Sequence, residues 1–226
     1  DYTRTDADND ADLDGALALG NGRTGLLVDS GGTLNGNINL GSGSAINVEG
    51  NNSAGVSIQS ILNGNYTQRG SATVTGSNSV GIEFRQDVTG NVAIGGASSA
   101  TFAQGEGSVG VRVLGDVAGE FLIDGTVQAT GFTSTTLSNY ADPDTLGPND
   151  TPIAARRDAD DLLVGGAAVE IRGDLGRGFL INGNAVGGAD PTNTIKDVIQ
   201  DFNENRTAGT VASIGSAPAL LIQALD

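Results

Sequence analysis

The chain has 226 residues and a formal net charge of −16, from 27 acidic and 11 basic residues. A surface this acidic repels phosphate backbones and anionic lipids, so the composition disfavours nucleic-acid partners and binding to membrane surfaces. Cysteine is absent, which excludes disulfides and thiolate metal sites, and no apolar run reaches the roughly 18 residues that a membrane-spanning helix requires.

The N-terminal segment, residues 1–22, is acidic and contains the pattern that most suggests a metal site. Asp10, Asp12 and Asp14 alternate with other residues just before a glycine. Alternating carboxylates in such a place can surround a calcium ion with oxygen ligands. The twelfth position of the loop is Asn21, where a bidentate glutamate is usual. Two interpretations stay open: a calcium site at the three aspartates, and a solvated acidic segment without a cofactor.

From residue 25 onward, a small residue followed by an apolar-x-apolar pair occurs six times. The first three spacings are 30, 26 and 29 residues, which is the length of one coil in a solenoid. The repeated apolar pairs are Leu26 and Val28, Val56 and Ile58, Ile82 and Phe84, Val111 and Val113, Val169 and Ile171, and Leu220 and Ile222.

Two further strands are predicted in each coil. The second contains Ile38 and Leu40, Tyr66, Val92 and Ile94, Phe121 and Ile123, and Phe179 and Ile181. The third contains Ile46 and Val48, Ala72 and Val74, Ala100 and Phe102, and Val127 and Ala129. Glycines that precede the second strand are expected to bend the chain through positive φ angles, at Gly36, Gly64, Gly90 and Gly119.

Three short strands per coil predict an all-β chain folded as a right-handed parallel β-helix, a single solenoid over residues 1–226. The hand follows from the preference of crossover connections between parallel strands. A β-sandwich with glycine-rich hairpins is the alternative, but sandwiches do not repeat one motif at a fixed period.

Two inserted loops are expected to interrupt the coils. Residues 132–166 are rich in turn formers such as Ala141-Asp142-Pro143-Asp144. Residues 187–216 contain apolar residues at the spacing of a short amphipathic helix, namely Ile195, Val198, Ile199 and Phe202. Loops that leave a rigid scaffold often bind partners, although packed decorations of the solenoid are the other interpretation.

The coil starts Ser79-Val80-Gly81-Ile82 and Ser108-Val109-Gly110-Val111, together with the corner at Gly115 to Gly119, resemble the passenger region of bacterial autotransporters. The resemblance covers nearly all of residues 20–226. It implies export through the outer membrane, a β-helical passenger displayed on the bacterial cell surface, and a C-terminal β-barrel, so that this chain would be part of a longer protein.

Catalysis is not expected. Asp29-Ser30-Gly31-Gly32 is similar to the nucleophile loop of serine proteases, but the chain has no histidine to act as its base, so a turn is predicted there. Glycan-cleaving β-helices use paired carboxylates. The candidates for such a pair occupy repeated coil positions, which repetition alone explains: Glu83, Asp87, Asp116, Glu170 and Asp174.

The sequence therefore favours an extracellular structural and adhesive rod that is not an enzyme. Its expected partners are copies of itself, joined end to end or laterally, or proteins and glycans of cell surfaces. A protein that binds or cleaves glycans is the alternative. No cofactor is expected apart from the possible calcium ion.

Overall fold

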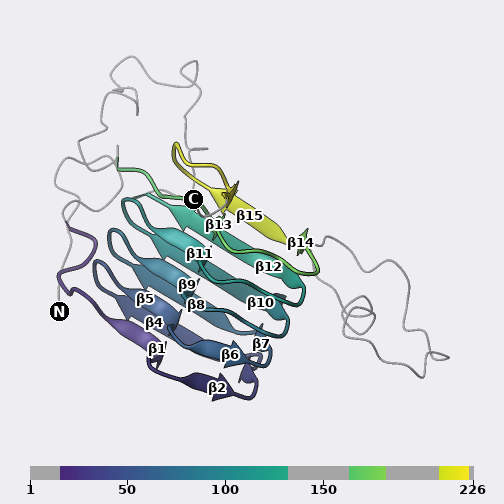
Figure 1. The fold of residues 1–226 in the computed structure, drawn as a ribbon. Coiled ribbons are helices and arrows are strands. Elements are labelled where there is room, and N and C mark those ends of the chain that lie inside the picture. The colour runs from purple at the N-terminus through teal and green to yellow at the C-terminus, as the bar shows by residue number, and fades with distance from the viewer. Residues whose placement is uncertain (1–15, 132–162, 182–208, 224–226) are drawn as a thin grey trace, which may run out of the picture.

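The computed structural model of the protein describes residues 16–131, 163–181 and 209–223. In this part of the chain every strand pairing is parallel, no helix occurs, and the strands stack as a β-solenoid of about four turns (Figure 1). The predicted all-β parallel solenoid is therefore confirmed. Within the described residues there is accordingly no helix long and apolar enough to cross a membrane.

One flat wall, called here the first sheet, contains the first strand of every coil. The inward side chains of these strands are apolar, and the outward side chains of the middle strands are polar. The backbone groups of one coil can pair only with the coils on either side of it. The six strands, in spatial order, are β1 (Thr24–Val28), β5 (Ala54–Ile58), β9 (Val80–Phe84), β11 (Val109–Val113), β13 (Val169–Ile171) and β16 (Leu220–Ile222).

The second and third strands of the coils form an eight-stranded sheet, and a two-stranded sheet closes one corner. Second strands are β3 (Ile38–Leu40), β7 (Tyr66–Gln68), the start of β10 (Val92–Gln104), the start of β12 (Phe121–Thr130) and β14 (Phe179–Ile181). Third strands are β4 (Ala45–Glu49), β8 (Ser71–Thr75), the ends of β10 and β12, and β15 (Thr210–Ser213). The corner pair is β2 (Thr33–Asn35) with β6 (Ile61–Asn63).

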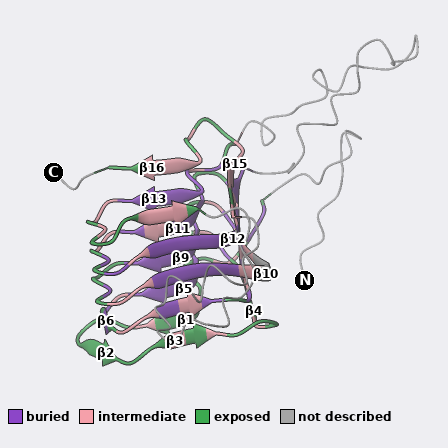
Figure 2. Ribbon diagram, turned by 90° about the vertical axis from the view of Figure 1, so that its right-hand side faces the viewer, coloured by how far each residue is buried: buried purple, intermediate pink, exposed green. Residues whose placement is uncertain are grey.

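The core is a set of columns made by equivalent residues of successive coils. Val56 pairs with Ile82, and Ile82 pairs with Val111, as the repeat predicts. All three side chains are fully buried. Figure 2 shows that burial is greatest in the middle coils, whereas at one end of the stack β2 is exposed and β3 is only partly buried.

One predicted third strand is wrong in register by one residue. In residues 100–104, the part of β10 that forms the third strand, the buried residues are Thr101 and Ala103, and they pair with Ala72 and Val74 of the core. Phe102, which the sequence places inside, is half-buried on the outer side. The cause is a β-bulge: seven positions separate Ile94 from Thr101, where four separate Ile123 from Val127 in the next coil.

The corner glycines also serve a purpose different from the predicted one. Only Gly36 has a positive φ, of 135°, among the four glycines expected to need it. At Gly64, Gly90 and Gly119 a Cβ atom would lie 2.2 to 2.5 Å from a carbonyl oxygen of the neighbouring coil. These glycines therefore allow close stacking of coils at the corner, which a side chain would prevent.

The ends of both predicted loops belong to the solenoid. The amide of Gly107 donates to the carbonyl of Val164 at 3.0 Å, so residues 163–166 already follow the coil. Within the predicted loop 187–216, residues 210–213 form β15, which pairs with β12. The predicted helix and most of both loops lie outside the described residues.

Candidate functional site

The outer face of the first sheet carries a row of polar side chains at one position of successive strands. Ser57, Glu83, Arg112 and Glu170 are register partners along β5, β9, β11 and β13. We call these four residues the polar row. They point outward because the residues on either side of them in each strand fill the core. Two of the carboxylate candidates, Glu83 and Glu170, are thus on one face.

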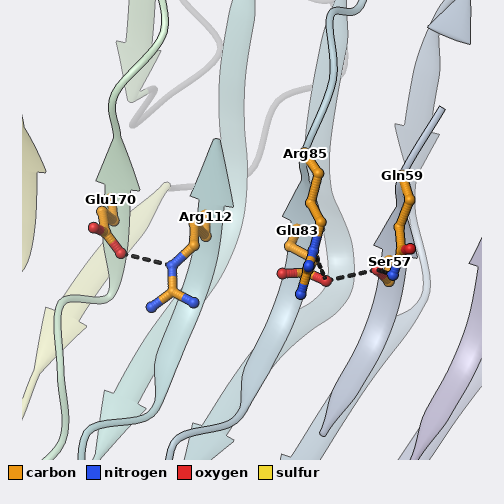
Figure 3. Close-up of polar contacts among 6 residues, drawn as sticks. All are labelled: Ser57, Gln59, Glu83, Arg85, Arg112 and Glu170. Carbon is orange, nitrogen blue, oxygen red and sulfur yellow. Dashed lines mark hydrogen bonds and ion pairs between the residues drawn. The ribbon is translucent and has the colours of Figure 1, made fainter. Parts of the chain in front are cut away.

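Glu83 of β9 is held by Ser57 of β5 and by Arg85, which directly follows β9 (Figure 3). Its Oε1 atom accepts hydrogen bonds from Ser57 Oγ at 2.6 Å and from Arg85 Nε at 2.8 Å. Gln59 Nε2 in turn donates to Ser57 Oγ at 3.0 Å. The side chain of Glu83 is 5% exposed and that of Arg85 is 53% exposed. The carboxylate is therefore covered by its partners while the guanidinium meets solvent.

Glu170 is bound by two arginines. Arg112 Nε donates to Oε2 at 2.7 Å from the neighbouring strand (Figure 3). Arg172 Nε donates to Oε1 at 2.7 Å, and its Nη2 lies 2.6 Å from the same oxygen. Burial raises the pKa of Glu170, but the hydrogen bonds and positive charges of the two arginines outweigh it and leave the pKa lowered. The group is anionic at neutral pH. A carboxylate in this state is suited to fixing two arginines, and poorly suited to donating a proton as a general acid.

Arg112 lies between the two glutamates in the register, so the structure does not bring Glu83 and Glu170 together as a carboxylate pair. Charges of the row alternate from strand to strand. This arrangement is the cross-strand pattern that stabilises sheets.

The other carboxylate candidates form a separate column at a corner. Asp87 Oδ1 accepts the backbone amide of Asp116 at 2.9 Å, and Asp116 Oδ1 accepts that of Asp174 at 2.8 Å. Each aspartate thus satisfies the backbone of the coil above it. In the described residues no group of three or more acidic, histidine or cysteine side chains is arranged to hold a metal ion. Asp10, Asp12 and Asp14, the predicted calcium ligands, lie outside those residues.

Asparagine and serine make two similar ladders that the sequence interpretation missed. The amide of Asn65 donates to Asn37 Oδ1 at 2.8 Å, and that of Asn91 donates to Asn65 Oδ1 at 2.8 Å. In the serine ladder, Ser53 N donates to Ser79 Oγ and Ser79 N to Ser108 Oγ, each at 3.1 Å. Their recurrence at the coil spacing is the signal that could have identified them.

The segment that is similar to a protease nucleophile loop is a turn, as predicted. Ser30 N donates to its neighbour Asp29 Oδ1 at 2.8 Å, both residues are exposed, and Gly31 has a φ of 108°. Ser60 Oγ also donates to the carbonyl of Asp29. The contacts are those of a bend between β1 and β2.

Polar side chains of the described coils are thus used mainly to join one coil to the next. Comparison with protein-family models, with curated proteins and with solved structures finds no match for this chain.

Proposed function

We propose that the chain is an extracellular structural and adhesive segment: a stiff β-solenoid rod on a bacterial surface that presents its inserted loops to partners or to copies of itself. The observation that carries the proposal is that the side chains of the described residues connect each coil to the next. Apolar residues form continuous columns, and the polar row and the corner ladders join coil to coil. A rod gains stiffness from both features, because each coil is held on its inner and its outer side.

The positions of the two insertions support presentation of loops. The second insertion leaves after Ile181 and returns at Thr210, and these residues pair with Ile123 and Thr126 of β12. The two ends of this insertion therefore pair with residues that are only three positions apart on β12. A short linker could therefore connect the two ends of this insertion on the rod.

The first insertion is anchored in the same manner. Gly105 N donates to the carbonyl of Gly131 at 3.1 Å, and Gly107 N donates to that of Val164 at 3.0 Å. Both ends of this loop therefore lie on one neighbouring corner. Two long additions on adjacent coils of an otherwise regular stack are the pattern that a display scaffold requires.

The test replaces each insertion, residues 132–162 or 182–208, by a short glycine-serine linker. We expect both variants to keep the circular dichroism spectrum and unfolding midpoint of the parent chain, and at least one to lose adhesion of protein-coated beads to bacterial cells and to beads carrying the same chain. Unchanged adhesion in both variants, or no adhesion of the parent chain, would contradict the proposal.

A glycan-cleaving β-helix is the rival to be tested in parallel. Incubation with acidic and neutral polysaccharides should release no reducing ends above the level of a heat-denatured control. Release that disappears in Glu83→Gln or Glu170→Gln would replace the structural proposal by an enzymatic one.

A further inference from the structure

The outer side of the third strands is a nearly uncharged surface on a strongly acidic chain. β4, β8, β10, β12 and β15 pair in this order, and Figure 2 shows β4, β10, β12 and β15 along one side of the stack. In the three middle strands the outward residues are serine, threonine, glutamine, one alanine and one phenylalanine. Glu49, at the end of β4, is a carboxylate at the edge of this surface. We call the outer side of these five strands the uncharged wall.

Phe102 places an aromatic ring at the centre of this wall. The residue is half-buried, and its register partners on the two neighbouring strands are Thr73 and Gln128. The other aromatic rings of the described residues belong to core columns, namely Tyr66, Phe84, Phe121 and Phe179. Phe102 is therefore the described aromatic residue that faces outward from a wall of the solenoid.

The register that exposes Phe102 costs stability, and the bulge of β10 maintains it. Thr101 fills the core position between Ala72 and Val127 and is 0% exposed. Its Oγ1 atom accepts a long hydrogen bond of 3.4 Å from Gln68 Nε2. A register shifted by one residue would place the ring inside and the hydroxyl outside, which is the usual distribution of these residue types. Bulges that re-aim a side chain in this way are over-represented next to active sites.

Polar side chains around Phe102 are not used to join one coil to the next. Within the described part of the chain, the side chains of Thr73, Thr126 and Gln128 make no hydrogen bond to another protein group. The oxygens of the polar row and the corner ladders, in contrast, accept hydrogen bonds from the neighbouring coil. One amide and two hydroxyls beside the ring therefore remain available as donors and acceptors for a ligand.

The size and the charge of the wall decide which kind of partner fits it. Strands about 4.8 Å apart, each contributing five residues, give the wall a footprint of roughly 340 Å². A stable interface between two proteins buries about 800 Å² of each partner, so the wall alone is too small for a second copy of the chain. The net charge of −16 disfavours polyanions, and one carboxylate at the edge offers little to a polycation. A small, uncharged and hydroxyl-rich ligand matches both properties.

We infer that the uncharged wall binds a neutral glycan, with one sugar ring packed on Phe102. The C–H groups on the face of a sugar ring are attracted to the electron-rich face of an aromatic ring. Hydroxyls at the rim of the sugar exchange hydrogen bonds with Thr73, Thr126 and Gln128. The inference rests on the proposed adhesive function, which it deepens by adding a binding surface on the rod itself, apart from the two insertions.

Native electrophoresis in gels that contain a neutral polysaccharide tests the inference. The chain migrates through its net charge of −16, and an uncharged polysaccharide changes this mobility only by binding or by sieving. The probes are dextran, mannan and a mixed-linkage β-glucan, each in its own gel, with a protein that binds no glycan as the sieving standard. At least one probe should retard the parent chain. Phe102→Ala should weaken this binding about tenfold, because the ring supplies the main apolar contact, whereas Phe102→Tyr keeps the ring and should bind like the parent.

Leu27→Ala is the matched control, because it removes an apolar side chain that is 50% exposed on the outer face of the first sheet. It should leave the retardation unchanged, and circular dichroism spectra show that the variants are folded. Retardation of the parent by none of the probes, or equal retardation of Phe102→Ala, would overturn the inference. So would a dimer of the parent chain, seen by sedimentation equilibrium, that Phe102→Ala dissociates, because a second copy would then occupy the wall.

Chains that lack residues 132–162 or 182–208 separate this inference from the proposed function. Both should still be retarded by the glycan that retards the parent, because the wall is retained. Loss of retardation in either deletion chain would assign glycan binding to an insertion and overturn the inference. Adhesion that depends on the insertions, in a parent chain that no probe retards, would leave the proposed function standing without the glycan site.

Discussion

The hydroxyl of Tyr66 donates a hydrogen bond to Oε1 of Gln68 at 2.7 Å inside the solenoid, where both side chains are buried. Gln68 pairs with Leu40 and Ile94, so an amide stands in a column that is otherwise aliphatic. Its Nε2 atom reaches the carbonyl of Gly70 and Thr101 Oγ1 at 3.4 Å each. The Tyr66 ring also packs edge-on against Phe84, with centroids 5.0 Å apart.

Tyr66→Phe is expected to lower the free energy of unfolding by about 1–3 kcal/mol, because it leaves the buried carbonyl oxygen of Gln68 without its donor. The double variant Tyr66→Phe with Gln68→Leu should recover most of this loss, since both polar partners are then removed. Urea unfolding of the single and double variants measures the difference. A double variant less stable than Tyr66→Phe would show that the amide contributes through its other contacts.

Stability should depend on pH through Glu170. Its pKa is lowered in the folded state, so its contribution to stability is present above the ordinary carboxyl pKa and is lost as the pH falls through the lowered value. Replacing Glu170 by Gln is expected to cost about 1.5–3 kcal/mol at pH 7, through its charged hydrogen bonds to Arg112 and Arg172. The difference in the free energy of unfolding between the parent chain and Glu170→Gln should shrink as the solution becomes strongly acidic.

Urea midpoints at a series of pH values check this dependence. Glu106→Gln changes an exposed side chain and is the control. The difference between its urea midpoint and that of the parent chain should be the same at every pH. A gap between the parent chain and Glu170→Gln that stayed constant down to strongly acidic pH would contradict a pKa of Glu170 that folding lowers.

Close stacking of coils should make some glycines irreplaceable and others neutral. A Cβ at Gly81 would lie 2.4 Å from the carbonyl oxygen of Gly110 and 2.6 Å from Thr101 Cγ2. Gly81→Ala is therefore expected to destabilise by about 1–3 kcal/mol, through a backbone shift in a packed core. Gly41→Ala has open space at the new Cβ and no positive φ, so a gain of about 0.4–1 kcal/mol is expected. Thermal unfolding compares the two, and equal midpoints would contradict the stacking argument.

The repeat in the sequence predicts the first strands correctly because a small residue and two apolar residues mark each of them. Side-chain pairing between coils is harder to predict. Arg112 and Glu170 are 58 positions apart, and the predicted insertion 132–166 lies between them in the sequence. The serines and asparagines of the two ladders recur in the sequence at the spacing of the coils. Their hydrogen bonds depend in addition on which backbone amide each side-chain oxygen faces, and the spacing does not show this. A periodic pattern shows which residues share a column and does not show what their polar atoms contact.

The bulge in β10 is where local pattern and three-dimensional register disagree. Ala100 and Phe102 alternate as core residues would, yet three additional residues after Ile94 change the side to which the strand points. Phe102 instead pairs with Thr73 and Gln128, which lie on the outer side of their strands. Alternation alone cannot distinguish two registers that differ by one residue.

The two registers make opposite predictions for Phe102→Ala. In the structure the side chain is half-buried and outside the core, so the loss in the free energy of unfolding should be no more than about 1 kcal/mol. Phe121→Ala is the matched comparison, because Phe121 is fully buried and stacks on Phe179 with centroids 5.3 Å apart, and it should cost about 3–5 kcal/mol. Similar losses for both, measured by urea unfolding, would place Phe102 in the core and require β10 to be shifted by one residue.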